Sequence, residues 1–423
     1  MQLLKSFSIY TIGYLLSQAI NFLLIPVFTH FLSPVDYGIL ALISTITSFA
    51  TPIILINMDG AISIEYYKKA FNNLSSYISS CFANSIVALA AATVVLALAG
   101  LCFPNTFSFP KIWLITIPVF CFMEGVKNVN VLLFQIKKKP YAYALYTLSG
   151  VLLNIGLSLI FVAVLKYNYA GRLFGQYIVS FIYCIIGIII LKRQQLVTFK
   201  IKKDMMKDAL HFGVPLIPHA IGFIIINLAD RFFVAHFAGN AQLGIYSLAY
   251  TLGSIIFMIA MAFNTAWTPY FFELLEQNTV QSKTKIVKIT YLFIAGLFIA
   301  TLGLSVLTPF IFKYFINEKF SEGAAIVPWV AFSCFFFGCY LAFTNYISYL
   351  KKNKIFAYVS IINITLNMLL NFLLIKQYGI FGAALATFCS FGFFALIIAF
   401  VAIKIYPMPW LNVSFKTLKL SDE

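Results

Sequence analysis

The chain has 423 residues, of which 62% are hydrophobic and 10% are charged, and its formal net charge is +16. Soluble domains carry about 25% charged residues, and no soluble fold of this length has enough interior to bury so much apolar surface. The basic residues lie in short clusters between apolar runs, which argues against a nucleic-acid-binding face. The composition therefore predicts an all-α integral membrane protein.

Apolar runs follow one another almost without interruption along the chain. A bilayer core about 30 Å thick requires about 20 apolar residues per crossing helix. We predict twelve transmembrane helices, at residues 7–30, 38–64, 76–102, 112–135, 141–164, 171–191, 209–237, 243–271, 286–312, 324–349, 356–375 and 379–404. Helix breakers mark several junctions: Ser33-Pro34, Pro104-Asn105, Lys139-Pro140 and Gly239-Asn240. Pro215 and Pro218 are expected to bend the seventh helix.

The distribution of Lys and Arg predicts the orientation. With the N-terminus inside, 21 of the 29 basic residues fall in inner segments and six fall in outer segments. The remaining two, Lys127 and Arg231, lie within predicted spans. Cytoplasmic loops carry the excess of Lys and Arg in membrane proteins. Both termini are therefore expected to be cytoplasmic.

The two halves of the chain share an ungapped pattern. His30-Phe31 returns as His236-Phe237, and Gly38-Ile39 returns as Gly244-Ile245. Chance similarity between apolar segments is the alternative, but the pattern includes polar residues. Six spans per half predict a parallel repeat, with a pseudo-twofold axis along the membrane normal. We predict two pseudo-symmetric six-helix lobes at residues 1–191 and 209–404, a basic cytoplasmic linker at 192–208 and a cytoplasmic tail at 405–423.

Sequence motifs for catalysis and cofactor binding are missing. No Gly-Lys dipeptide occurs, so there is no phosphate-binding loop for ATP, and no HExxH or GxSxG motif occurs. The seven Cys form no CxxC pair and do not alternate with His, which predicts small buried hydrophobic residues, not metal ligands. The predicted outer loops are short. We therefore expect no catalytic site, no cofactor and no metal, and an architecture typical of a secondary transporter.

Four charged residues within the predicted spans are the first candidates for a binding site. A charge at the bilayer centre costs about 2.5–3.5 kcal/mol on insertion scales. Glu124 and Lys127 are three residues apart and share one helix face, so they either form a structural ion pair or line a cavity. Asp230 and Arg231 are adjacent, and at least one of them must face the bundle. Alternatively, Arg231 extends its side chain to the outer headgroups.

Amide side chains form a second candidate group. Asn363, Asn367 and Asn371 recur every four residues on one face of the eleventh predicted helix. Such a stripe either lines a wet path or bonds to a neighbouring helix, and we slightly favour packing. Gln18 and Asn21 in the first predicted helix add further amides.

Three segments resemble the Wzx-type polysaccharide flippases: YTIGYLLSQAINFLLIPVFTHFLSPVDYGIL at 10–40, FGVPLIPHAIGFIIINLADRFFVAHFAGNAQLGIYSLAY at 212–250, and YGIFGAALAT at 378–387. That family belongs to the multidrug, oligosaccharidyl-lipid and polysaccharide exporter superfamily. The resemblance implies a MATE-like fold of two six-helix lobes around a central cavity, in the bacterial cytoplasmic (inner) membrane. It also implies translocation of undecaprenyl-diphosphate-linked oligosaccharide repeat units for O-antigen, lipopolysaccharide or capsule.

Under this resemblance, Lys127 and Arg231 are expected to receive the diphosphate head, one base from each half, while the lipid tail stays in the membrane lipid. Glu124 and Asp230 leave the net charge of the cavity open. Coupling to an H⁺ or Na⁺ gradient is also left open. A polysaccharide polymerase and glycosyltransferases are the protein partners that such a pathway implies.

Three rival functions are kept. A cation-coupled multidrug exporter of the same superfamily would use a membrane carboxylate such as Asp59 or Glu124. A membrane glycan polymerase or ligase is less consistent with the short outer loops. A membrane scaffold would have no use for polar residues inside the bundle.

Overall fold

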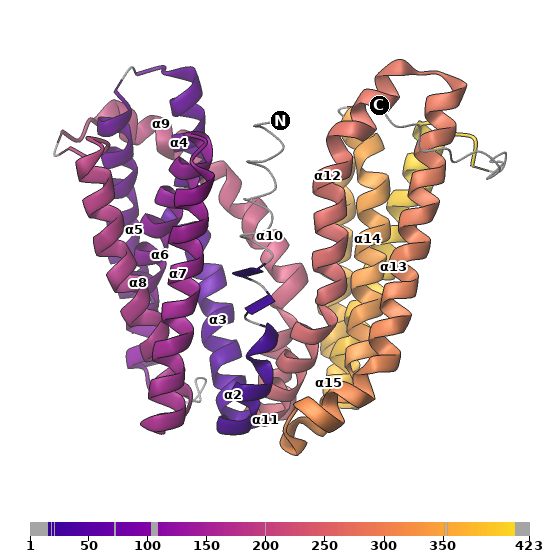
Figure 1. The fold of residues 1–423 in the computed structure, drawn as a ribbon, viewed down its shortest axis with the longest axis horizontal. Helices are drawn as coiled ribbons and strands as arrows, with labels where there is room; N and C mark the ends of the chain where they lie inside the picture. The colour runs from indigo at the N-terminus through magenta and orange to yellow at the C-terminus, as the bar shows by residue number, and fades with distance from the viewer. Residues whose placement is uncertain are drawn as a thin grey trace. The chain divides into compact units, whose positions relative to one another are not determined.

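The computed structural model describes residues 16–17, 19–20, 22–71, 73–102, 109–198, 200–350, 352 and 354–410. Within these ranges the regular structure is helical and no strand occurs, as the sequence predicted (Figure 1). The beginning of the predicted first helix, together with Gln18 and Asn21, and most of the predicted tail lie outside the described residues.

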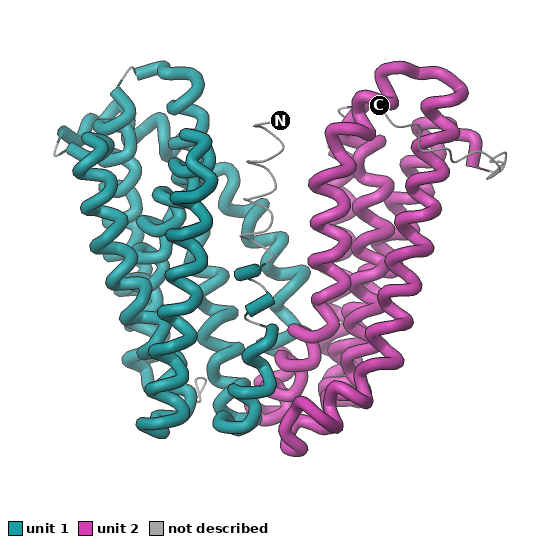
Figure 2. The backbone as a smooth tube through the Cα atoms, in the orientation of Figure 1, with its two compact units in different colours: residues 1–232 teal, residues 233–423 magenta. Residues whose placement is uncertain are grey.

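The first of two compact units spans Met1–Phe232 (Figure 2). Its helix α6 (Ile112–Ile136) is central, because it packs against most of the other long helices of the unit. The remaining helices are α2 (Ile25–Phe31), α3 (Pro34–Leu55), α4 (Met58–Lys68), α5 (Leu74–Cys102), α7 (Pro140–Leu159), the π-helical turn η1 (Ile160–Val164), α8 (Asn168–Arg193), α9 (Lys203–Gly213), the 3₁₀ turn η2 (Val214–Leu216) and α10 (Ile217–Leu228).

The second compact unit spans Phe233–Glu423, and α11 (Asp230–Gly253) begins just before it. Helix α14 is central here, because it packs against α12, α13 and α15. Positive φ angles at Gly239 (83°) in α11 and at Gly379 (57°) in α15 break both helices at predicted junctions. Glycine tolerates such angles because it has no Cβ. The other elements are α12 (Ile255–Gln277), α13 (Val280–Phe315), the 3₁₀ segment η3 (Glu318–Ala325), α14 (Val327–Tyr349) and α15 (Lys354–Ile405).

Nine helical segments of the described chain are long and apolar enough to cross a membrane. Together they overlap every predicted span from residue 38 onward. Two of them, Lys203–Gln277 and Lys354–Ile405, are far longer than one crossing requires and contain the breaks at Gly239 and Gly379. The total of twelve spans and the side of each terminus remain predictions.

The segment between the predicted lobes is docked on the first unit. Helix α9 packs against α4 and α5, and α10 packs against α3. Asn84 donates to the carbonyl of Met206 at 3.0 Å, and the Tyr77 hydroxyl donates to Asp208 at 2.7 Å. The border between compact units therefore falls at Phe232, later in the chain than the linker predicted at 192–208.

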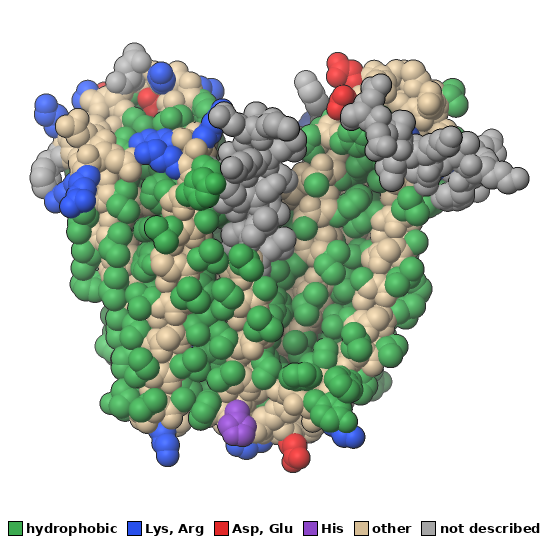
Figure 3. Space-filling view, in the orientation of Figure 1, with side chains coloured by type: hydrophobic (Ala, Val, Ile, Leu, Met, Phe, Trp, Pro, Cys, Tyr) green, Lys and Arg blue, Asp and Glu red, His purple; other side chains and the backbone are tan. Residues whose placement is uncertain are grey.

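Basic side chains gather at one end of the first unit, around α9 and the end of α4, and hydrophobic side chains cover much of its length (Figure 3). Lys137, at the end of α6, donates to Gln194 at 2.7 Å. Burial lowers the pKa of this Lys137, and the charge of Lys139 adds to the effect. The positive-inside rule makes this the expected cytoplasmic end. The exposed bases here are Lys68, Lys69, Lys138, Lys139, Lys192, Arg193, Lys200, Lys202, Lys203 and Lys207.

The repeated sequence pattern has a local counterpart in each unit. The rings of His30 and Phe31 meet edge to face with centroids 5.6 Å apart, and those of His236 and Phe237 do so at 4.8 Å. Gly38 and Gly244, each eight residues after its histidine, are both buried. The pseudo-twofold itself remains a prediction.

Two broken helices of the first unit, α3–α4 and α9–α10, come into close backbone contact at Gly213. The predicted helix 38–64 is broken at Ile56 and Asn57, both with φ of 49°. A β-branched residue in this left-handed region is strained, so the surrounding packing must hold it. Asn57 donates to the carbonyl of Gly213 at 3.3 Å, and a Cβ at Gly213 would clash with the Ile56 carbonyl oxygen. The second of these helices, predicted at 209–237, also breaks here, at η2, as expected from Pro215 and Pro218.

We expect Gly213→Ala to destabilise the first unit, because the added methyl group must push the strained Ile56 carbonyl away. Overpacking of this kind costs about 1–3 kcal/mol. The matched control is Gly156→Ala in α7, where a Cβ would meet nothing within 4 Å. Thermal unfolding of both purified variants in detergent tests the prediction. Equal unfolding midpoints for the two variants would contradict it.

Candidate functional site

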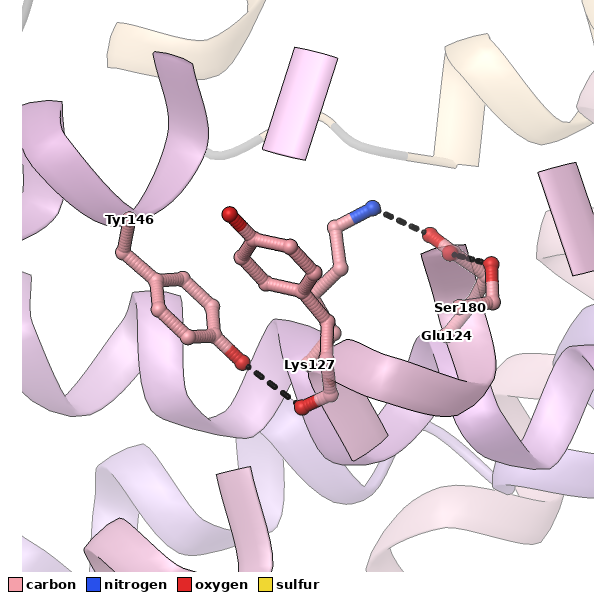
Figure 4. Close-up of polar contacts among 5 residues, drawn as sticks. Glu124, Lys127, Tyr146 and Ser180 are labelled. Carbon is pink, nitrogen blue, oxygen red and sulfur yellow. Dashed lines mark hydrogen bonds and ion pairs between the residues drawn. The ribbon is translucent and has the colours of Figure 1, made fainter. Parts of the chain in front are cut away.

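The ion pair predicted in the fourth helix is formed. Lys127 Nζ lies 2.7 Å from Glu124 Oε2 on α6, and the two side chains are 26–27% exposed. Ser180 on α8 donates to the other carboxylate oxygen, Oε1, at 2.5 Å (Figure 4). The carboxylate of Glu124 is therefore engaged on both oxygens, by residues of two helices.

This pair belongs to a longer series of contacts between α6 and α8, which we call the polar seam. The seam has three levels: Thr116 with Tyr177 at 3.1 Å, Glu124 with Ser180 at 2.5 Å, and Lys137 with Gln194 at 2.7 Å. Its ends on α6 are separated by about 30 Å at 1.5 Å rise per residue, close to the thickness of the hydrocarbon core. The seam thus links α6 to α8 across the whole apolar region.

The seam also has neighbours on the side of α7. Tyr146 of α7 donates to the backbone carbonyl of Tyr183 at 3.1 Å (Figure 4). Buried Asn130, one turn beyond Lys127, donates to the carbonyl of Val126 at 2.9 Å. Tyr146 and Asn130 thus donate to backbone carbonyl groups, and neither is bonded to Lys127. Its bond to Glu124 uses one of the three ammonium donors, and its side chain is still partly exposed.

The second predicted charge pair lies at the start of α11. Asp230 is 4% exposed, and the side chain of Arg231 is half-buried. The next residue, Phe232, places its ring 5.8 Å from that of Phe49 in α3. Because α10 packs against α3, Arg231 falls in the same compact unit as Lys127. That Lys127 and Arg231 come one from each lobe stays a prediction, since the compact units are not the predicted six-helix lobes.

The asparagine stripe is inside the second unit. Asn363, Asn367 and Asn371 are 0–2% exposed in α15. Asn367 donates to Ser390 Oγ at 3.1 Å and accepts from Asn371 at 2.8 Å. Ser390 follows the break at Gly379, so the bond from Asn367 to Ser390 joins the two arms of α15. These contacts favour packing for Asn367 and Asn371, whereas the amide of Asn363 has no hydrogen-bond partner among the described residues.

Several side chains of the site were not identified from the sequence. Ser180 and Tyr177 are ordinary residues in the sixth predicted span, and nothing in one sequence pairs that span with the fourth. Their spacing of three residues, on one helix face, is the only signal. Among the described residues no group of three His, Cys, Asp or Glu side chains is placed to hold a metal ion.

Two family models match the chain. The model described as Polysaccharide biosynthesis protein matches residues 3–275, and the model described as MatE matches residues 215–373. The protein titled "Lsg locus putative protein 1" of Haemophilus influenzae is 24% identical, over 86% of this chain and 89% of its own. An uncharacterized membrane protein of the same organism is 23% identical, over 86% and 88%.

Solved structures share the fold. The structure titled "Lipid II flippase MurJ, inward closed conformation" has a TM-score of 0.73 and 16% identity, over 94% of this chain and 88% of that chain. An inward-facing multidrug resistance MATE family transporter of the MOP superfamily also has a TM-score of 0.73, with 12% identity over 92% and 94%. These likenesses establish the fold, which agrees with the expected MATE-like architecture.

We expect the Glu124–Lys127 pair to be energetically coupled. Lys127→Met leaves the carboxylate without its cation, and Glu124→Gln leaves the ammonium without its anion, so each should lower stability. The double variant should be more stable than the sum of the two losses predicts, by about 1 kcal/mol. The measurement is denaturant unfolding of the four proteins in detergent. Lys111→Met, which replaces the exposed base directly before the same helix, is the control. Additive losses would show that the pair is not coupled.

For the asparagine stripe we expect Asn367→Leu to lower stability by about 1–3 kcal/mol, because the buried amide of Asn371 loses its acceptor. Thr365→Val is the control, since this exposed residue on the same helix bonds only within its own turn. Thermal unfolding in detergent compares the two. An unchanged midpoint for Asn367→Leu, together with impaired transport, would instead indicate that the stripe lines a water-filled path.

Proposed function

Because the chain belongs to the family of polysaccharide biosynthesis proteins, whose model matches residues 3–275, we propose that it is a lipid-linked oligosaccharide flippase. The proposed substrate is an undecaprenyl-diphosphate-linked repeat unit for O-antigen or capsule. The proposed transport runs from the inner to the outer leaflet of the cytoplasmic membrane by alternating access.

The coarser function follows from the family and the fold. The chain is a multi-pass bacterial membrane transporter of the flippase and exporter superfamily, and it is not an enzyme. The substrate proposal draws on two names: the Lsg locus relative and the lipid II flippase, whose title identifies a lipid-linked substrate.

The observation that carries the proposal is Lys127, a partly exposed ammonium group within a membrane-spanning helix. A diphosphate head cannot cross hydrocarbon without compensation, because its charges lose their hydration. Lys127 supplies a compensating charge part of the way across, and Arg231 supplies a second base in the same unit. The lipid tail stays in the bilayer. Asp230 beside Arg231 and Glu124 beside Lys127 limit the positive charge when no substrate is present.

Glu124 is also the proposed link to an ion gradient. Its carboxylate is shared between Lys127 and Ser180. When a diphosphate draws Lys127 away, the carboxylate loses its strongest partner and becomes a place for a proton or Na⁺. A polymerase and the glycosyltransferases of the pathway are the proposed functional partners.

Multidrug export is the second candidate, and the MatE match over residues 215–373 favours it. A drug-cation exporter would depend on a carboxylate such as Glu124 or Asp59, and it would tolerate the loss of Lys127. The two functions therefore differ in which member of the ion pair is indispensable.

We expect Lys127→Ala and Arg231→Ala to reduce flippase activity by about tenfold to a hundredfold, because losing one charge-assisted contact costs about 1.5–3 kcal/mol. Arg231→Lys keeps the charge but loses the planar fork, so it should be less impaired than Arg231→Ala. The assay is restoration of surface glycan in a flippase-null strain with the cognate glycan locus, with membrane protein measured by immunoblot.

Lys111→Ala is the matched control, because it removes an exposed base from the start of α6. Full glycan restoration by both Lys127→Ala and Arg231→Ala, at normal protein level, would refute the assignment of the two bases. Drug resistance that requires Glu124 but not Lys127 would support the exporter instead.

A further inference from the structure

A second cation lies at the opposite end of the first unit from the basic cluster. Arg172 is in the second turn of α8, whereas Arg193 at the other end of this helix belongs to the basic cluster. Arg172 precedes Ser180 by eight residues, which places it about 12 Å beyond the seam's central level along the helix axis. By sequence, Arg172 is one of the six bases counted with the outer segments, at the edge of the predicted span 171–191.

The guanidinium group of Arg172 is held among aromatic side chains. Its Cζ lies 4.5 Å from the ring centroid of Phe28 in α2, within the range of a cation–π contact. Tyr37 of α3 is close enough to interact with it electrostatically. Within the described residues, the buried Nη1 of Arg172 has no hydrogen-bond partner. A buried donor without an acceptor is costly, and such groups call for an explanation.

The carboxylate of Asp36, the residue before Tyr37, is bonded to other groups. Asp36 accepts from the backbone N–H of Ser33 at 2.9 Å and from its hydroxyl at 2.6 Å, which caps α3. Its other oxygen accepts from the backbone N–H of Tyr169 at 3.4 Å. The ion pair described above joins Glu124 to Lys127 and does not involve Arg172. The position of Arg172 therefore suits an anion that the protein itself does not provide.

The backbone that precedes Arg172 is closely packed. A Cβ on the preceding residue, Gly171, would lie 2.9 Å from the carbonyl carbon and oxygen of Phe161. Phe161 belongs to the π-helical turn η1, which is closed by the bond from Leu165 N–H to the Ile160 carbonyl at 3.0 Å. Such turns occur frequently at functional sites. The close packing fixes where the guanidinium emerges from α8.

We propose that Arg172 is an exit subsite for the phosphate oxygens of a prenyl diphosphate at the predicted outer end of the first unit. The inference rests on the proposed flippase function and names a second position for its substrate. A guanidinium offers a planar fork of donors that matches phosphate oxygens. The side chain as a whole is partly exposed, and the Phe28 ring, 4.5 Å from Cζ, is one of the groups that an incoming phosphate would displace.

The separation along α8 makes this subsite distinct from that of Lys127. A diphosphate group is too short to reach across about 12 Å, so one head cannot occupy both places. The head is therefore held first beside Lys127 and then beside Arg172. Two successive cations shorten each step that the charged head takes through the apolar region.

Trp113 provides a reporter for this subsite. Its ring lies 5.5 Å from that of Phe174, two residues beyond Arg172. The other three tryptophans, Trp267, Trp329 and Trp410, belong to the second unit and can be replaced by Phe. The experiment measures Trp113 fluorescence of the full chain in phosphatidylcholine nanodiscs during titration with farnesyl diphosphate, farnesol or inorganic diphosphate.

We expect saturable responses to farnesyl diphosphate, with at least tenfold weaker apparent affinity in Arg172→Gln and a smaller loss in Arg172→Lys. Lys166→Gln, an exposed base at the same end, should match the parent protein. A response to inorganic diphosphate that Arg172→Gln weakens equally supports the site and shows that the tail adds little. A response to farnesyl diphosphate alone shows that the membrane-borne form is required.

Unchanged affinity in folded Arg172→Gln overturns the proposal, as does an equal response to farnesol. A lower unfolding midpoint with unchanged affinity would show that Arg172 only stabilises the packing of α8 against α2. This result also overturns the proposal. If Arg172→Gln does not fold, Arg172→Lys decides by the same criterion. Glycan restoration separates this inference from the flippase proposal: Arg172-dependent binding without any glycan export by the parent protein refutes only the latter.

Discussion

A charge inside hydrocarbon must have a partner, and this requirement organises the first unit. Glu124 satisfies it twice, with Lys127 on its own helix and Ser180 on α8. The contacts of Thr116 with Tyr177 and of Lys137 with Gln194 continue this polar bonding toward the two ends of the α6–α8 interface. Because hydrophobic association is weak between helices in lipid, such bonds and close packing set which helices adjoin. Central α6 is thus fixed by its polar residues as much as by its apolar ones.

The sequence predicted the features that depend on local chemistry. The apolar runs predicted helices, because backbone groups in lipid must bond within their own segment. Pro215 and Pro218 predicted the break at η2, Gly239 predicted the break in α11, and the end of one apolar run at 375 predicted the junction near Gly379. The spacing of three between Glu124 and Lys127 predicted their contact. Each of these needs no knowledge of any other helix.

The features that were not predicted depend on which helices are neighbours. Ile56 has no intrinsic preference for the left-handed region, and its strain is tolerated only because Gly213 leaves room for its carbonyl group. The docking of α9 likewise depends on polar groups in the first half of α5, such as Tyr77 and Asn84, which donate to Asp208 and to the Met206 carbonyl. Amphipathic character alone gave no reason to place this segment on the first unit.

The charged pair and the broken helix are in direct contact through Gly125. A Cβ at Gly125 would clash with Leu55 at the end of α3 and would lie 2.8 Å from the Met58 side chain at the start of α4. The residue beside Glu124 is therefore pressed against the two residues that flank the break. Since interiors are close-packed, a change of angle between α3 and α4 must move α6 or open a void. Movement of α6 alters the distance from Glu124 to Ser180 on α8. The strained break and the partly exposed ion pair are therefore joined by close packing at Gly125, so neither can shift without repacking Leu55 and Met58.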